Sequence, residues 1–172
     1  MGNLKIKKVC GLSISSIHFS MMILPYIKKE LETEKNVITI LETNLEKNIN
    51  QILSKLTITD EEKEKILNIN WKETDIKKLS IEKNLREKIE ESENVDIVIY
   101  GSEQYINNAG EIINKVTNDT IKKNKIIKII NCYSVNDFNE NIQQILDHHD
   151  IMFNTSGEHN IEEAFKGYKK IS

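Results

Sequence analysis

The residues whose types and spacing are most suggestive of chemistry lie between Cys10 and His18. An apolar run ends at Cys10, and a loop with the sequence Gly-Leu-Ser-Ile-Ser-Ser-Ile-His follows it. A loop between a strand and a helix binds phosphate when its backbone N–H groups converge and the helix presents its positive N-terminal end. Three serine hydroxyls would add donors for an anion. The candidate nucleotide- or anion-binding residues are therefore Ser13, Ser15, Ser16, Ile17 and His18.

The same loop lacks the cation that phosphoryl transfer requires. No lysine occurs between Val9 and Ile27, whereas phosphate-binding loops use a lysine to contact the β- and γ-phosphates. Without it the charge that develops during transfer has no stabilising partner, so we do not expect catalysis by this route. Two interpretations stay open: a site that binds an anion, or a turn in which Ser15 or Ser16 only caps the following helix.

Cys10 is a second candidate, because a thiol beside a helix N-terminus has a lowered pKa. The stretch "CGLSISS" resembles the phosphocysteine loop of phosphotransferase-system IIB domains, and "VDIVIYGSEQYI" is similar to a later strand of those domains. That resemblance implies a phospho-acceptor at Cys10. The alternative is an inert cysteine buried in a strand.

Polar residues at the ends of two other expected strands complete the candidates. In parallel sheets ligands bind at the carboxyl ends of the strands, which makes Glu42, Asn44 and Ser102 further site residues. Glu42 and Glu103 could form a carboxylate pair across the sheet. The cysteines and histidines have no metal-ligand spacing, so no metal is expected.

Strand and helix patterns alternate along the chain and predict the elements that position these residues. The expected strands are 5–11, 36–41, 95–100, 125–131 and 150–154. The expected helices are 16–34, 44–56, 80–92, 104–116, 138–146 and 160–171. Such alternation predicts one three-layer α/β domain over 1–172, P-loop NTPase-like or Rossmann-like, with a mostly parallel sheet of about five strands. The charged stretch 57–93 is interpreted as a helical insertion that contains Trp71 as its only aromatic residue and anchor.

The segment 9–44, about a fifth of the chain, resembles the deviant phosphate loop of MinD/ParA/CpaE-like proteins. The motif "SISSIHFSMMILPYI" is similar to the family's "GVGTTHFSIMLANYL"-type stretch, and "NVITILETN" to its second strand. The resemblance places Ser13 and Ser15 at the loop glycines, and Ser16 and Ile17 at the paired threonines. The residues that match the family directly are His18, Phe19, Ser20 and Tyr26, while Glu42 and Asn44 fall on its acidic and amide positions.

The chain departs from that family where catalysis is concerned. The loop glycines and lysines are missing, and Tyr100 stands where the family's magnesium-associated aspartate is expected. The resemblance therefore implies the fold, together with a non-catalytic scaffold, positioning or regulatory role through protein partners. A homodimer or a complex with an ATPase relative would fit, as would service to bacterial pilus, division or partition machines. No cofactor is expected beyond vestigial binding of a nucleotide or phosphate.

Composition limits the remaining possibilities. A net charge of −3 gives no general attraction to nucleic acid. No apolar run approaches the roughly 18 residues of a membrane span, so direct membrane insertion is not expected. Cys10 and Cys132 lie far apart, and no signal-peptide pattern is visible, which predicts a reduced, cytoplasmic protein.

Overall fold

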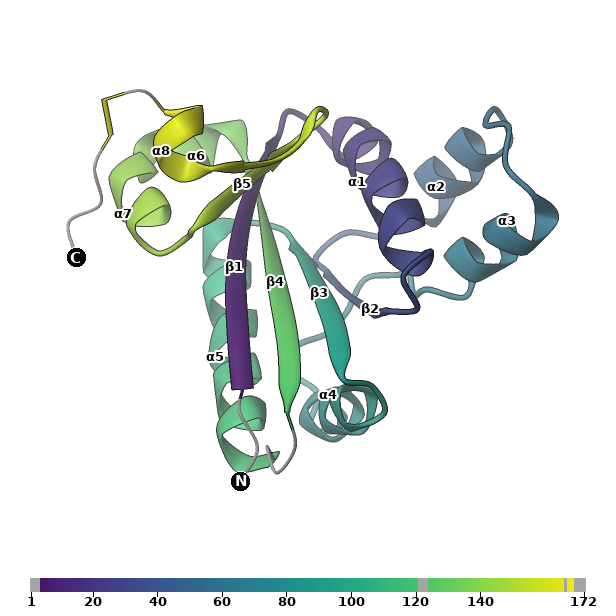
Figure 1. Ribbon diagram of the computed structural model, residues 1–172, viewed down its shortest axis with the longest axis horizontal. Helices are drawn as coiled ribbons and strands as arrows, with labels where there is room; N and C mark the ends of the chain where they lie inside the picture. Colours follow the sequence, from purple (N-terminus) through teal and green to yellow (C-terminus); the bar gives the residue numbers. More distant parts are fainter. Residues whose placement is uncertain (1–3, 121–123, 166, 169–172) are drawn as a thin grey trace.

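The computed structural model contains a single six-stranded sheet with helices on both faces (Figure 1). It describes residues 4–120, 124–165 and 167–168. The strands are β1 (Leu4–Ser13), β2 (Asn36–Leu41), β3 (Asn94–Tyr100), β4 (Lys125–Ser134), β5 (Ile151–Asn154) and β6 (Gly157–Asn160). They follow the order β2-β3-β4-β1-β5-β6, in which β5 and β6 pair antiparallel and the other neighbouring strands pair parallel. The predicted three-layer, mostly parallel α/β fold is confirmed.

The helices divide between the two faces. They are α1 (Ser16–Leu31), α2 (Glu46–Leu53), α3 (Asp60–Leu67), α4 (Ser80–Glu90), α5 (Glu103–Thr120), α6 (Val135–Glu140), α7 (Ile142–Asp147) and α8 (Ile161–Ala164). Buried residues of α1, α2 and α3 form one core with the sheet, and those of α4 to α8 form the other. We call these the α1 face and the α5 face.

The order of the strands explains this division. From β1 the chain crosses the sheet to β2, and then returns through β3 and β4 before it passes β1 to reach β5. Right-handed crossovers that run in opposite directions along a sheet place their helices on opposite faces. The first crossover helix, α1, therefore lies on one face, and α4, α5, α6 and α7 lie on the other.

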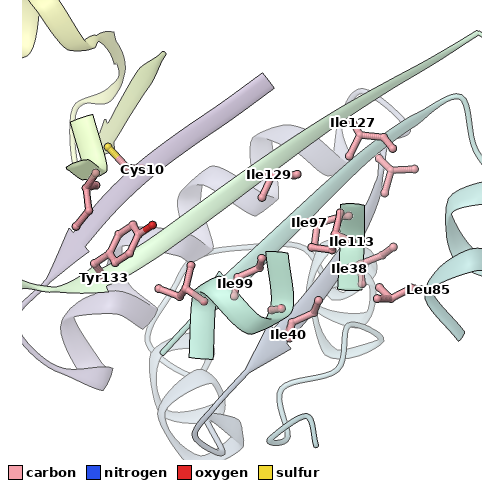
Figure 2. Packing of buried hydrophobic residues seen from close by; sticks show 14 of the residues in the cluster. Cys10, Ile38, Ile40, Leu85, Ile97, Ile99, Ile113, Ile127, Ile129 and Tyr133 are labelled. Atoms are coloured by element: carbon pink, nitrogen blue, oxygen red, sulfur yellow. The ribbon is translucent and has the colours of Figure 1, made fainter. Parts of the chain in front are cut away.

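Isoleucine side chains make up most of the core on the α5 face (Figure 2). Ile38, Ile97 and Ile127 come from three neighbouring strands and lie on this side, with Leu85 of α4 beside them. β-branched side chains suit strands that are covered on both faces, because they pack well on a pleated surface. The other core contains Trp71, whose Nε1–H donates to Ile66 O at 2.9 Å. Trp71 is therefore part of the core on the α1 face, whereas α4 of the same segment 57–93 packs into the core of the α5 face.

The structure corrects several details of the C-terminal third. The predicted helix 138–146 is two short helices, because the chain leaves helical geometry at Asn141. β6 was not predicted; residues 157–160 form a hairpin with β5, and Gly157 adopts a φ of 108° that favours glycine. α8 ends at Ala164, and the end of the predicted helix 160–171 lies outside the described residues.

No helix among the described residues combines the length and apolar character needed to cross a membrane.

Candidate functional site

The loop from Gly11 to His18, which we call the serine loop, lies at the topological switch point of the sheet. Ser13 at the end of β1 is paired with Ser134 at the end of β4, and the helices that follow these strands go to opposite faces. In parallel sheets this switch point opens a crevice at the carboxyl ends of the strands, where ligands bind. The structure therefore brings the predicted loop to the usual ligand-binding position of such a sheet.

The polar groups of the loop are used within the loop itself. Ser15 is the N-cap of α1 and accepts a hydrogen bond from His18 N at 3.2 Å. His18 Nδ1 in turn accepts from Ile14 N at 3.0 Å. Two backbone donors that an anion would use are thus satisfied by side chains of the chain, which is the capping arrangement foreseen for Ser15.

The other loop residues differ in their exposure. Ser13 is only 1% exposed, and its Oγ has no hydrogen-bond partner among the described residues. Ser16 Oγ lies 3.2 Å from Tyr100 Oη. Ile17 is exposed, as is the neighbouring Ile14.

Tyr100 fills the space beside the loop. Its ring stacks on Phe19 with centroids 4.1 Å apart and planes 10° from parallel. An aromatic ring packed on the first turn of α1 contributes stability through buried area and stacking. The position where the family resemblance expects a magnesium-associated carboxylate therefore holds a packing residue.

Glu42 caps a second helix at the same edge. Its carboxylate accepts from Ser102 N at 2.8 Å and lies 3.4 Å from Ser102 Oγ, and Ser102 Oγ accepts from Tyr105 N at 3.2 Å. Gly101 permits this approach, because a Cβ there would lie 2.9 Å from the Glu42 side chain and 2.8 Å from the Tyr105 ring. The negative charge lies at the N-terminus of α5, where the helix dipole favours it.

Asp137 of α6 completes the cap of α5. Its Oδ2 accepts from Glu103 N at 3.1 Å, and the side chain of Glu103 accepts from Asn141 Nδ2. The predicted carboxylate pair thus has separate partners for each member: Ser102 for Glu42, and Asn141 for Glu103. Asn44 makes a local contact, in which its Oδ1 accepts from Glu46 N at 2.9 Å.

Both cysteines are buried in the sheet as thiols that are not joined in a disulfide. Cys10 belongs to the core of the α5 face (Figure 2), and Cys132 to the core of the α1 face. Burial raises the pKa of the Cys132 thiol above its ordinary value. A phospho-acceptor must meet its donor, and Cys10 has no exposed surface for this.

A buried charged cluster on the α1 face was missed by sequence reasoning. Lys128 of β4 donates to Tyr26 Oη at 2.9 Å and to Glu158 Oε1 at 2.8 Å, and lies 3.8 Å from Glu30 Oε2. The Tyr26 hydroxyl also donates to Glu158. Asp96, paired with Lys128 across β3 and β4, is 2% exposed and completes the cluster. The available signal was a charged residue inside each of the apolar runs "VDIVIY" and "KIIKIIN".

The carboxyl group of Asp96 holds its proton at neutral pH. Burial raises its pKa from 3.8 to about 8, and the neighbouring Glu30 carboxylate adds to the rise. Burial also opposes the ionisation of Glu30, but hydrogen bonds from Asp96 and Lys35 and the charge of Lys128 outweigh it and lower the pKa of Glu30. With Asp96 neutral, the carboxylates of Glu30 and Glu158 face the ammonium groups of Lys35 and Lys128. The charges of the cluster therefore balance.

The histidine pair His148 and His149 follows α7 directly. The Nδ1 atoms of both residues lie 2.6 Å from a carbonyl oxygen of the last turn. His149 is buried, with its Nε2 3.0 Å from Asn131 Nδ2, and burial lowers its pKa to about 4. No group of three or more potential metal ligands occurs among the described residues.

Comparison of the chain with protein-family models, with curated proteins and with solved structures gave no match.

Replacement of Glu42 tests the cap of α5. Glu42→Ala removes both the charge and the acceptor at the helix N-terminus, and we expect a loss of about 1 kcal/mol in the free energy of unfolding. Glu42→Gln keeps an acceptor and should lose about half as much. Urea unfolding measures both, with Glu87→Ala on the exposed side of α4 as the control. A loss no larger than that of the control would show that Glu42 does not cap α5.

Asp96 should make the protein less stable as pH rises. Its folded-state pKa of about 8 lies above the ordinary 3.8, so the folded protein keeps a proton that the unfolded chain releases within this interval. The contribution of Asp96 to the free energy of unfolding therefore falls between about pH 4 and pH 8, by at most about 1.4 kcal/mol for each pH unit. Asp96→Asn should remove this fall and be the more stable protein at pH 8, whereas Glu64→Gln should not. Parallel pH profiles of wild type and D96N would contradict the assignment.

Proposed function

We propose that the protein is a non-catalytic α/β protein of the MinD/ParA/CpaE-like type that acts as a scaffold, positioning or regulatory component by binding a protein partner in the cytoplasm. The observation that supports this proposal is that side chains of this chain cap both helix N-termini at the carboxyl edge of the sheet. Ser15 and His18 satisfy the turn before α1, and Glu42 and Asp137 satisfy the start of α5. Because these backbone N–H groups already donate to side chains, they are not available to bind a phosphate group.

An exposed apolar surface next to the serine loop supports binding to a protein. Ile14, Ile17 and Met21 are 80%, 42% and 60% exposed, and Pro25 is exposed one helical turn further on. We call these four residues the loop patch. No charged residue occurs between Lys8 and Lys28, although 30% of the chain is charged. Interface cores are likewise poor in charge and rich in large apolar side chains.

A second copy of this chain is the partner that the loop patch fits. The chain as a whole is rich in charge, with 27 acidic and 24 basic residues, so a contact between other faces would desolvate charged side chains. Two copies of the loop patch meet without desolvation of an unpaired charge. A two-fold arrangement places the same residues on both sides of the contact.

Sedimentation of purified protein tests this function. We expect a concentration-dependent dimer, no turnover of ATP, and a monomer for the double variant Ile17→Lys and Met21→Lys, because four lysines would be buried at one contact. Leu79→Lys, at an exposed position before α4, is the control and should remain dimeric. A wild-type monomer at roughly 100 μM, which corresponds to weaker than about 5 kcal/mol of association, would overturn the proposed contact. Steady ATP hydrolysis by pure protein would overturn the non-catalytic role.

Binding of a nucleotide or phosphate to the serine loop is a second candidate function. The observation that favours it is Ser13 Oγ, which is buried at the switch point and has no partner among the described residues. A buried hydroxyl without a hydrogen bond costs about 1–3 kcal/mol, which a bound anion would recover.

Titration calorimetry with ATP, ADP and inorganic phosphate in magnesium buffer distinguishes the two candidates. A dissociation constant below roughly 100 μM that is weakened at least tenfold by Ser13→Ala would support the anion site. Cys10→Ala provides the matched control, since it is a buried change in the same strand at a side chain that lies in the core of the α5 face. The absence of heat with all three ligands would leave the loop as a cap only.

A further inference from the structure

The N-terminal half of β1 is an open edge of the sheet. β1 pairs with β4 along all ten of its residues, but with β5 only over Val9–Gly11. One additional hydrogen bond, from Asp150 N to Lys8 O at 3.0 Å, extends the contact between β1 and the β5 segment to Lys8. Among the described residues no strand continues beside Leu4 to Lys7, and this part of β1 forms the margin of the sheet in Figure 1.

The backbone groups that face this margin can be identified. In a strand the N–H and C=O groups of one residue point to the same side, and they alternate along the chain. Because Lys8 O accepts from the β5 side, the N–H and C=O groups of Leu4 and Ile6 also point to the open side. By contrast, the outer edge of β2 has a partner at its carboxyl end, where Thr74 N donates to Leu41 O at 2.7 Å.

The side chains along the edge have two distinct characters. Leu4 and Ile6 pack against the core of the α5 face. Lys5 and Lys7 alternate with them and therefore point to the α1 face, where Ile126 is 45% exposed beside Lys5. No salt bridge is recorded for Lys5 or Lys7 within the described ranges, and the neighbouring Lys128 already has Glu158 as its partner.

We infer that this edge accepts an extended acidic segment of another protein, which adds a strand beside residues 4–8. Main-chain hydrogen bonds to Leu4 and Ile6 hold the segment, as in other cases of strand addition. Side chains of paired strands that face the same way are neighbours, so its acidic residues contact Lys5 and Lys7 and its apolar residues contact Leu4 and Ile6. The open edge spans about 17 Å, enough for five residues.

Lys5 and Lys7 make a second copy of this chain an unfavourable partner for the open edge of β1. Pairing of two such edges would place the lysines of one copy beside those of the other, and like charges on neighbouring strands are destabilising. An acidic segment turns the same lysines into attractive contacts. This surface is separate from the loop patch, so the inference does not depend on the proposed function.

A peptide that alternates glutamate and valine tests the inference. The probe is a labelled six-residue peptide of this pattern, blocked at both ends, and fluorescence anisotropy measures its binding to the full chain. We expect saturable binding that weakens with salt. A lysine–valine peptide of the same length should not bind, and neither should a glutamate–valine peptide whose alternate backbone nitrogens are methylated.

Two variants place the binding on β1. Ile6→Pro removes an N–H from the open edge but none from the β4 ladder, and should weaken binding about tenfold, whereas Ile6→Val should not. The double variant Lys5→Glu and Lys7→Glu should lose about tenfold in affinity for the acidic peptide and gain affinity for the basic one. Lys47→Glu with Lys55→Glu, two exposed changes in α2 and directly after it, is the control for net charge.

The inference is overturned if the acidic peptide fails to bind, if the methylated peptide binds equally well, or if the Lys5/Lys7 and Lys47/Lys55 variants lose affinity to the same extent. The lysine variants keep the test decisive if Ile6→Pro does not fold.

Discussion

The parallel pairing of β1 with β4 is the interaction on which the rest of this structure depends. It joins the first strand to the centre of the sheet over ten residues and brings Ser13 beside Ser134. Because the helices after these two strands leave to opposite faces, the pairing creates both the three layers and the topological switch point at the carboxyl ends of the two strands. It also holds β1 in place where β5 is absent, so that an open strand edge can exist within an ordered sheet.

The carboxyl edge shows how a ligand-binding position can become a structural one. Buried helix N-termini need acceptors, which a bound phosphate supplies in many proteins of this architecture. Here Ser15 and His18 supply them at α1, and Glu42 with Asp137 at α5. Gly101 is required for the second cap, because any side chain there would collide with Glu42. A protein–protein role is the proposal that agrees with this use of the edge and with the uncharged surface beside it.

The charged cluster under α1 serves a different purpose from the apolar cores. Lys128 connects the centre of the sheet to α1 through Tyr26 and to the β5–β6 hairpin through Glu158. Buried ion pairs add little net stability, but removal of one partner is expensive. The cluster therefore fixes where α1 and the hairpin sit relative to the sheet, and its charge balance depends on a neutral Asp96.

The sequence by itself determined the order of the main elements, the parallel sheet and a serine cap for α1, at either Ser15 or Ser16. These follow from local patterns: apolar runs, helical periodicity, and a hydroxyl before a helix. It did not determine that Ser13 lies beside Ser134, that Glu42 reaches Ser102, or that Asp96 meets Lys128, since each contact joins residues brought together only by strand order and register. It also missed β6, a four-residue polar strand that exists because β5 offers it a partner. Patterns along the chain report local preference, whereas contacts between distant residues are decided by how the sheet assembles.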